Sequence, residues 1–236
     1  MTTFTVTVNI QPKALASLKG YRVCLAKPVG QSGGPPAYNV VALASIVTAN
    51  NVIKFTDTFS IYGTLQTFNA GSATAQGNAP TLPITYGEAY HLPDWTDPPS
   101  VGNSTVAPAA GFAFINGVQA SVVVALQNGP TVGGNSAGAN SPFYISPSPD
   151  IPGTDTLTPV TEVALWFQRD IVTTTMIDLD MSTVHVMNLT GQTTVATTYT
   201  DSFQWQDDPS KVVDYTKVAP AAVKPIKKVE EKKYGY

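Results

Sequence analysis

The sequence predicts an all-β protein: an antiparallel β-sandwich of the jelly-roll or immunoglobulin-like kind, followed by an extended C-terminal tail. Short runs of alternating apolar and polar residues recur along the 236 residues, and turn-forming Gly, Pro, Asn and Asp residues separate them. Helical periodicity is weak almost everywhere. Charged residues make up only 12% of the chain, and Thr, Ser, Asn, Gly and Pro, which are typical of strand faces and turns, take their place.

The first strand is expected from Phe4 to Ile10, where apolar residues alternate with Thr and Asn. Pro12 ends this strand, and residues 14–18 can form a single helical turn. The later strands are expected at 21–26, 38–47, 52–55, 59–62, 65–68, 82–90, 118–126, 143–146, 162–167, 176–187 and 193–205. Loops are expected at 28–36, 69–80, 93–99 and 128–142, where Gly, Pro, Ser and Asn are frequent.

The two halves of the chain show a faint parallel, because Trp95 closes the first run of strands much as Trp205 closes the second. The sequence therefore predicts either two similar β units, at 1–98 and 99–210, or one continuous sandwich over 1–210. Residues 211–236 are rich in lysine and contain two prolines, which predicts an extended basic tail and not a packed element.

Scattered segments of the body resemble uncharacterised small soluble β-rich proteins from fungi and bacteria. The resemblance implies an all-β fold and transfers no catalytic residue, since no activity is assigned to that group. The segments that carry it are 38–41, 61–64, 143–147, 153–160, 163–168 and 173–176.

The location expected for this chain is the cytoplasm. Its one cysteine, Cys24, lies in an apolar run and predicts a buried side chain without a disulfide. The alternating residues after Met1 have neither the basic start nor the apolar core of a signal peptide, although release by a non-classical route is left open. No stretch approaches the ~18 apolar residues of a membrane span.

Few of the residues that enzymes usually recruit are present. The chain has two histidines, His91 and His185, and it contains no zinc-ligand spacing. It also contains no Gly-x-Ser-x-Gly elbow between a strand and a helix, because the matches to this pattern at 30–34 and 134–138 lie in Gly-rich loops. The acidic body also lacks the basic stripe with interleaved aromatic residues that nucleic-acid binding requires. We therefore expect no catalytic residue, no cofactor and no nucleic-acid partner.

Aromatic and acidic residues that follow one another closely give a candidate ligand site for a glycan or a membrane surface. Aromatic rings beside carboxylates bind sugars in many β-sandwiches, and the alternative is that these rings fill the ends of the core. The candidate residues are Tyr86, Tyr90, His91, Asp94, Trp95 and Trp205.

Asp178 and Asp180 are two residues apart, so on a strand both carboxylates would project from one face. They are a candidate site for a hard cation such as Ca²⁺. The alternative is a solvent-exposed strand face opposite Ile177, Leu179 and Met181.

Charge divides the chain into two parts of opposite sign. Residues 1–210 contain 6 Lys/Arg and 13 Asp/Glu (net −7), whereas residues 211–236 contain 7 Lys and 3 Asp/Glu (net +4). The tail can dock on its own body, on a neighbouring copy or on an anionic surface, or it can stay solvated. The tail residues expected to make contact are Lys224, Lys227, Lys228, Lys232, Lys233, Tyr234 and Tyr236.

This division leads to the functional expectation of a non-catalytic structural or interaction protein, a homo-oligomer that self-associates through its tail. The alternative is a carbohydrate- or membrane-binding module of lectin or cytolysin type that uses the loop aromatics.

Overall fold

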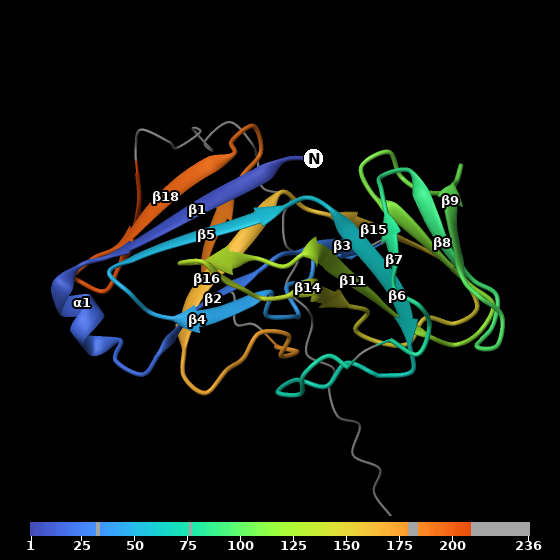
Figure 1. Ribbon diagram of the computed structural model, residues 1–236, viewed down its shortest axis with the longest axis horizontal. Helices are drawn as coiled ribbons and strands as arrows, with labels where there is room; N and C mark the ends of the chain where they lie inside the picture. Colours follow the sequence, from blue (N-terminus) through green and yellow to red (C-terminus); the bar gives the residue numbers. More distant parts are fainter. Residues whose placement is uncertain (32–33, 76, 179–183, 209–236) are drawn as a thin grey trace, which may run out of the picture.

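The computed structural model describes residues 1–31, 34–75, 77–178 and 184–208 (Figure 1). In these residues nineteen strands form four sheets, and the one helix is α1 (Pro12–Ser17). This confirms the prediction of an all-β, sandwich-like fold. In the part of the chain that the structure describes, no helix has the length and apolar character needed to cross a membrane.

Two sheets form the half of the molecule that carries β1, β18 and α1 in Figure 1. The first has six strands in the order β13-β12-β5-β1-β18-β19, and the second has four in the order β17-β16-β2-β4. Their strands are β1 (Thr3–Ile10), β2 (Arg22–Ala26), β4 (Leu43–Ile46), β5 (Asn50–Thr56), β12 (Thr131–Val132), β13 (Asn135–Ser136), β16 (Glu162–Gln168), β17 (His185–Asn188), β18 (Thr194–Tyr199) and β19 (Trp205–Asp207).

The other two sheets form the half that carries β6 to β9 (Figure 1). One has five strands in the order β3-β15-β10-β8-β9, and the other has four in the order β14-β11-β6-β7. Their strands are β3 (Val29–Gln31), β6 (Phe59–Thr64), β7 (Leu82–Ile84), β8 (Glu88–Leu92), β9 (Ser100–Asn103), β10 (Phe112–Asn116), β11 (Ser121–Asn128), β14 (Ala139–Ile145) and β15 (Gly153–Pro159).

The largest cluster of buried hydrophobic residues extends through all four sheets. One cluster of buried residues includes Val6 of β1, Leu165 of β16, Phe114 of β10 and Val124 of β11. The prediction for the first strand is confirmed, because the apolar residues of β1 are buried and the polar residues between them are not. Burying one face of each sheet against the next supplies the main favourable free energy of such a fold.

In the described residues, five stretches of chain pass directly from one half of the molecule to the other. Each has two residues, and they connect β2 to β3, β5 to β6, β11 to β12, β13 to β14, and β15 to β16. Every sheet contains strands from both sides of residue 98. A boundary at that residue therefore does not separate the sheets from one another.

Two of the fifteen strand pairings among the described residues are parallel, which differs from a wholly antiparallel sandwich. β1 pairs with β18 in parallel, and β8 pairs with β10 in the same way. The strands of each pair are far apart in the sequence, so no hairpin turn imposes an antiparallel direction on them.

The predicted helical turn exists and begins slightly earlier, at Pro12. Proline fits the first turn of a helix because its missing N–H has no partner there. The backbone N–H groups of Lys13 and Ala14 donate to Asp201 Oδ1 at 2.8 and 3.1 Å. A carboxylate 187 residues away thus caps a helix of six residues.

Several predicted elements need correction. Only β4 forms within 38–47, because the buried residues before it do not join a strand ladder: Val41 N donates to Thr175 O in a loop, and the Asn39 side-chain amide donates to Ile145 O at the end of β14. Residues 65–68 form no strand. The expected loops contain strands instead, namely β3 within 28–36 and β12, β13 and the start of β14 within 128–142.

Candidate functional site

A groove of about 950 Å³ lies at the end of the molecule where α1, the end of β4 and the segment after β16 meet. Two of its apolar side chains are unusually open to solvent, since Ile46 is 70% exposed and Val172 is 57% exposed. Its aliphatic lining consists of Leu15, Leu18, Ile46, Val47, Ile171 and Val172. Exposed apolar surface of this kind is typical of an interaction site.

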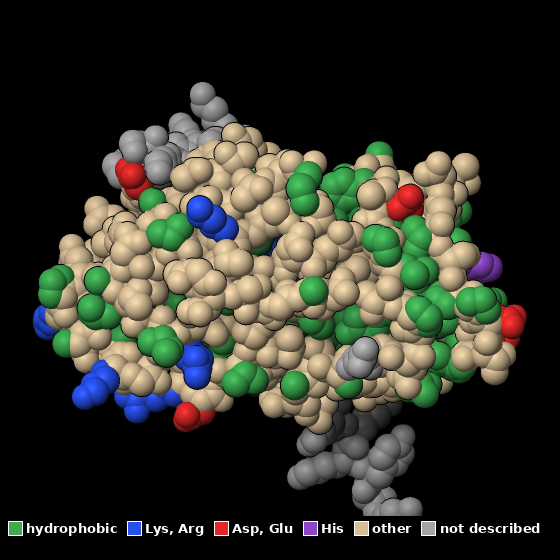
Figure 2. Space-filling model, in the orientation of Figure 1, with side chains coloured by type: hydrophobic (Ala, Val, Ile, Leu, Met, Phe, Trp, Pro, Cys, Tyr) green, Lys and Arg blue, Asp and Glu red, His purple; other side chains and the backbone are tan. Residues whose placement is uncertain are grey.

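Positive charge surrounds this apolar groove. Lys19 and Arg22 line it together with Asp170, and the guanidinium of Arg169 lies 4.5 Å from the centre of the Tyr21 ring, which also lines the groove. Figure 2 shows Lys and Arg side chains gathered at this end of the molecule. Because residues 1–210 carry a net charge of −7, the groove is a local exception to an acidic body.

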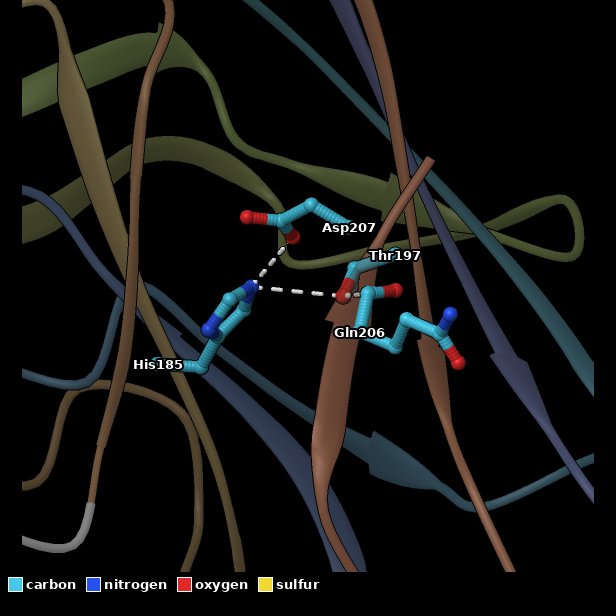
Figure 3. A network of polar contacts seen from close by, with 4 residues as sticks. All are labelled: His185, Thr197, Gln206 and Asp207. Carbon is cyan, nitrogen blue, oxygen red and sulfur yellow. Dashed lines mark hydrogen bonds and ion pairs between the residues drawn. The ribbon is translucent and has the colours of Figure 1, made fainter. Parts of the chain in front are cut away.

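A second feature joins the edges of two facing sheets (Figure 3). His185 lies on β17 and Asp207 on β19, and the Nε2 atom of His185 is 2.7 Å from Asp207 Oδ1. The same Nε2 atom is 3.2 Å from Thr197 Oγ1, which donates to the backbone oxygen of Gln206 at 3.3 Å. These bonds close one side of the sandwich.

Aromatic rings hold the imidazole in place. The His185 ring stacks on Trp205 with 4.9 Å between centroids and 7° between planes, and Trp205 stacks on Phe167 at 5.1 Å and 3°. Tyr199 packs against both Phe167 and Trp205. Of the predicted ligand residues, Trp205 is thus part of a half-buried aromatic stack.

The surroundings of Asp207 favour its ionised carboxylate. Burial acts to raise the pKa of Asp207, but the hydrogen bond and charge of His185 outweigh it, and the pKa lies below its ordinary value. In a catalytic relay the carboxylate and the hydroxyl bind opposite ring nitrogens, whereas here both lie on Nε2. The arrangement fits a structural link between the sheets and does not activate the Thr197 hydroxyl.

The predicted aromatic residues near β8 are separated in the structure. Tyr86 is 44% exposed and its ring stacks on Phe112 at 5.5 Å. Tyr90 is fully buried and its hydroxyl donates to Pro80 O at 3.0 Å, so its ring belongs to the core. His91 follows it on β8 and is exposed.

The loop after β8 is organised by its own polar groups. Asp94 Oδ1 accepts hydrogen bonds from the backbone N–H groups of Thr96 and Asp97 and from the Thr96 hydroxyl, which is a common role for Asp in turns. These bonds hold the pKa of Asp94 below its ordinary value. Trp95 is half-buried and packs against the core.

The other predicted residues are only partly covered. Asp178 is exposed, while Asp180 and the tail residues (Lys224, Lys227, Lys228, Lys232, Lys233, Tyr234 and Tyr236) lie outside the described residues. In the ranges that the structure describes, no three His, Cys, Asp or Glu side chains form a group that could hold a metal ion.

Sequence reasoning missed the groove, the network of His185 and Asp207, and the pair formed by buried Lys27 and Asp57. Lys27 is 1% exposed and its Nζ atom lies 3.8 Å from Asp57 Oδ1. The sequence offers one signal for the burial of Lys27, which is its position directly after the apolar run 21–26. Lysine is so rarely buried, however, that the residue type alone predicts exposure.

The fold and these features define the chain as a β-sandwich protein with an open, positively rimmed apolar groove. Comparisons with protein-family models, curated proteins and solved structures found no match. The function proposed below therefore comes from the chain's own residues.

Proposed function

We propose that this protein is a non-catalytic interaction protein that self-associates by adding a segment of one copy to a sheet edge of another. The observation that supports it most directly is the lack of charge on the sheet edges. In the described part of the chain the four sheets end in eight edge strands. Among the residues of these strands, Asp207 is the only Asp, Glu, Lys or Arg.

Natural sheet edges usually carry charges, above all lysine, because an unprotected row of N–H and C=O groups accepts strands from other chains. Here β7 and β14 each contain a proline, and one edge N–H of β4 donates to Thr173 Oγ1. β9, with the sequence Ser-Val-Gly-Asn, has neither charge nor proline. It is the edge that we expect to accept a segment most readily.

The basic tail is the segment that we propose as the added strand. Its net charge of +4 is attracted to a body of net −7, and valines, an isoleucine and tyrosines interrupt its lysines. Exposed ion pairs are individually weak and are screened by salt. Main-chain hydrogen bonds to an open edge would add the directional part of the interaction. Addition to a neighbouring copy produces a head-to-tail assembly.

Analytical ultracentrifugation of the full chain tests the proposal. We expect oligomers at low ionic strength, where the Debye length is about 30 Å at 0.01 M salt, and dissociation as salt is added. Replacing Lys224, Lys227, Lys228, Lys232 and Lys233 by Gln in the full chain should give monomers at both salt concentrations. A full chain that is monomeric at low salt would refute self-association.

A second pair of variants tests the edge itself. Ser100→Lys with Asn103→Lys places two charges on exposed positions of β9 and should weaken association. The matched control is Ala70→Lys with Thr190→Lys, which adds the same charge at exposed turn positions. Equal association of the two double variants would exclude β9 as the acceptor.

Binding to an anionic lipid surface is a second candidate function, and the groove favours it. Exposed Ile46 and Val172 beside Lys19, Arg22 and Arg169 combine an apolar contact with positive charge, as interfacial lipid binding requires. Co-sedimentation with phosphatidylglycerol vesicles but not with phosphatidylcholine vesicles would support it, and Ile46→Asp should abolish the difference. Equal recovery with both vesicles would exclude it.

A further inference from the structure

Lys27 and Asp57 lie at two of the places where the chain crosses between the halves of the sandwich. Lys27 is the first residue after β2 and precedes β3, and Asp57 is the first residue after β5 and precedes β6. β2 and β5 belong to the two facing sheets of one half, and β3 and β6 belong to the two sheets of the other. A link between these residues would join both layers at the middle of the molecule.

The Lys27 side chain is enclosed, the Asp57 side chain is 18% exposed, and the two are poorly satisfied as an ion pair. Lys27 is 1% exposed, and its Nζ atom lies 4.9 Å from the centre of the Phe55 ring. The Nζ to Asp57 Oδ1 distance is 3.8 Å, which is too long for a hydrogen bond. Asp57 Oδ1 is buried and accepts no hydrogen bond from the described residues. A buried carboxylate oxygen without a donor is rare and needs an explanation.

Two buried ions cost several kcal/mol of desolvation each, and good geometry with additional hydrogen bonds is what normally offsets this cost. That compensation is missing here. A neutral amide in place of the two ions would remove most of the cost. We propose that Lys27 Nζ and Asp57 Cγ become joined by an isopeptide bond after the chain has folded.

The reaction is a condensation that needs no oxidant or added group. The lone pair of the neutral Lys27 amine attacks Cγ of the protonated Asp57 carboxyl, and the new C–N bond gives a tetrahedral intermediate. One amine proton passes to a hydroxyl of that intermediate, the C–O bond breaks and one water molecule leaves. Asp57 lines a pocket of about 460 Å³ beside Tyr86 and Thr58, which gives the water an exit.

The surroundings favour the neutral forms that this reaction requires. Burial lowers the pKa of Lys27 in spite of the nearby carboxylate. Burial likewise raises the pKa of Asp57 in spite of the nearby amine. Both directions follow from the loss of water around a charged group.

The test is the covalent state of the full chain. After incubation of the folded protein at neutral pH, we expect a denatured mass lower than the sequence mass by one water molecule. Trypsin cuts after Arg22, Lys54 and Arg169, so the bond should yield peptides 23–54 and 55–169 joined to each other. Separate peptides of full mass from the incubated wild-type chain would overturn the proposal.

Variants separate the covalent link from simple charge pairing. Lys27→Arg keeps the positive charge but should release the two peptides, and Asp57→Asn should still join them with loss of ammonia instead of water. Lys54→Arg, at an exposed position of β5, is the matched control and should behave as the wild type. The wild-type peptide map decides the matter even if a variant fails to fold, and it does so independently of self-association.

Discussion

Gly117 lies where the chain turns from β10 toward β11, and an alanine there should destabilise the protein strongly. A Cβ atom on Gly117 would overlap the backbone oxygen of Pro93 and lie 3.1 Å from its carbonyl carbon. Neither atom belongs to a flexible side chain, so the backbone itself must move. The N–H of Gly117 also donates to Leu92 O at 2.8 Å, and this bond would lengthen.

The expected loss follows from these two contributions. Overpacking costs about 1–3 kcal/mol, and weakening one backbone hydrogen bond costs about 1 kcal/mol. Gly117→Ala should therefore lower the free energy of unfolding by about 2–4 kcal/mol, which at 2–4 °C per kcal/mol is a fall in Tm of roughly 5–15 °C. Urea titration and thermal unfolding followed by circular dichroism measure both quantities.

Gly102 on the edge strand β9 is the matched control. A Cβ atom there would meet nothing within 4 Å. Gly102→Ala should stabilise the protein by up to about 1 kcal/mol, because alanine reduces the freedom of the unfolded chain. If Gly117→Ala and Gly102→Ala changed stability equally, the reasoning from backbone contact at Gly117 would be wrong.

Three further predictions concern the aromatic stack, a carboxylate and the cysteine. Trp205→Ala should lower the free energy of unfolding by about 1.5–3 kcal/mol, which is less than the loss for a fully buried ring. Trp205→Phe, which keeps an aromatic ring, should cause less than half of that loss. Equal losses for the two variants in urea titrations would show that stacking contributes nothing. Burial and the charge of Asp155 raise the pKa of Asp150 to about 6, so the stability that its proton provides is present at pH 4 and is lost as the pH rises through 6. The free energy of unfolding of Asp150→Asn, relative to that of the wild type, should therefore rise by about 1 kcal/mol between pH 4 and pH 7.5. This figure is reduced because Asp150 is partly exposed. A difference between the two proteins that does not change with pH would contradict this reasoning. Burial raises the pKa of Cys24 to about 12, so iodoacetamide at pH 8 should modify this thiol only when urea unfolds the chain. Mass spectrometry detects the modification. Rapid modification of the native chain would contradict the burial of Cys24.

The fold class was predictable because the strongest strands carry their own signal. The alternation from Phe4 to Ile10 gave the position of β1 and the identity of its buried face. The apolar run that becomes β16 was equally clear. Both strands pack one face or both faces on the core, so the order of their apolar and polar residues predicts which positions are buried.

The missed strands have weaker patterns. β15 reads Gly-Thr-Asp-Thr-Leu-Thr-Pro, and its buried residues are Leu157 and Pro159. It becomes a strand because β10 and β3 pair with it on either side, which is a property of the assembled sheet. Conversely, the apolar segment 38–42 is buried without a ladder of its own, so its hydrophobicity suggested a strand that does not form.

The candidate sites were less predictable because they join residues that are distant in the chain. His185 and Asp207 meet only because β17 and β19 are edges of facing sheets. Trp205 was singled out for its ring, but its stacking partners could not be known without the sheet order. The groove likewise depends on α1 lying beside β4 and the segment after β16.

The position of β1 between β5 and β18 has a consequence for synthesis of the protein. Residues 3–10 emerge from the ribosome long before their parallel partner, residues 194–199. The six-stranded sheet can close only after residues 194–207 have been made, and pairings this distant are slow to form. Until then one side of β1 presents unpaired backbone groups, so the incomplete chain is more prone to aggregation than the finished fold.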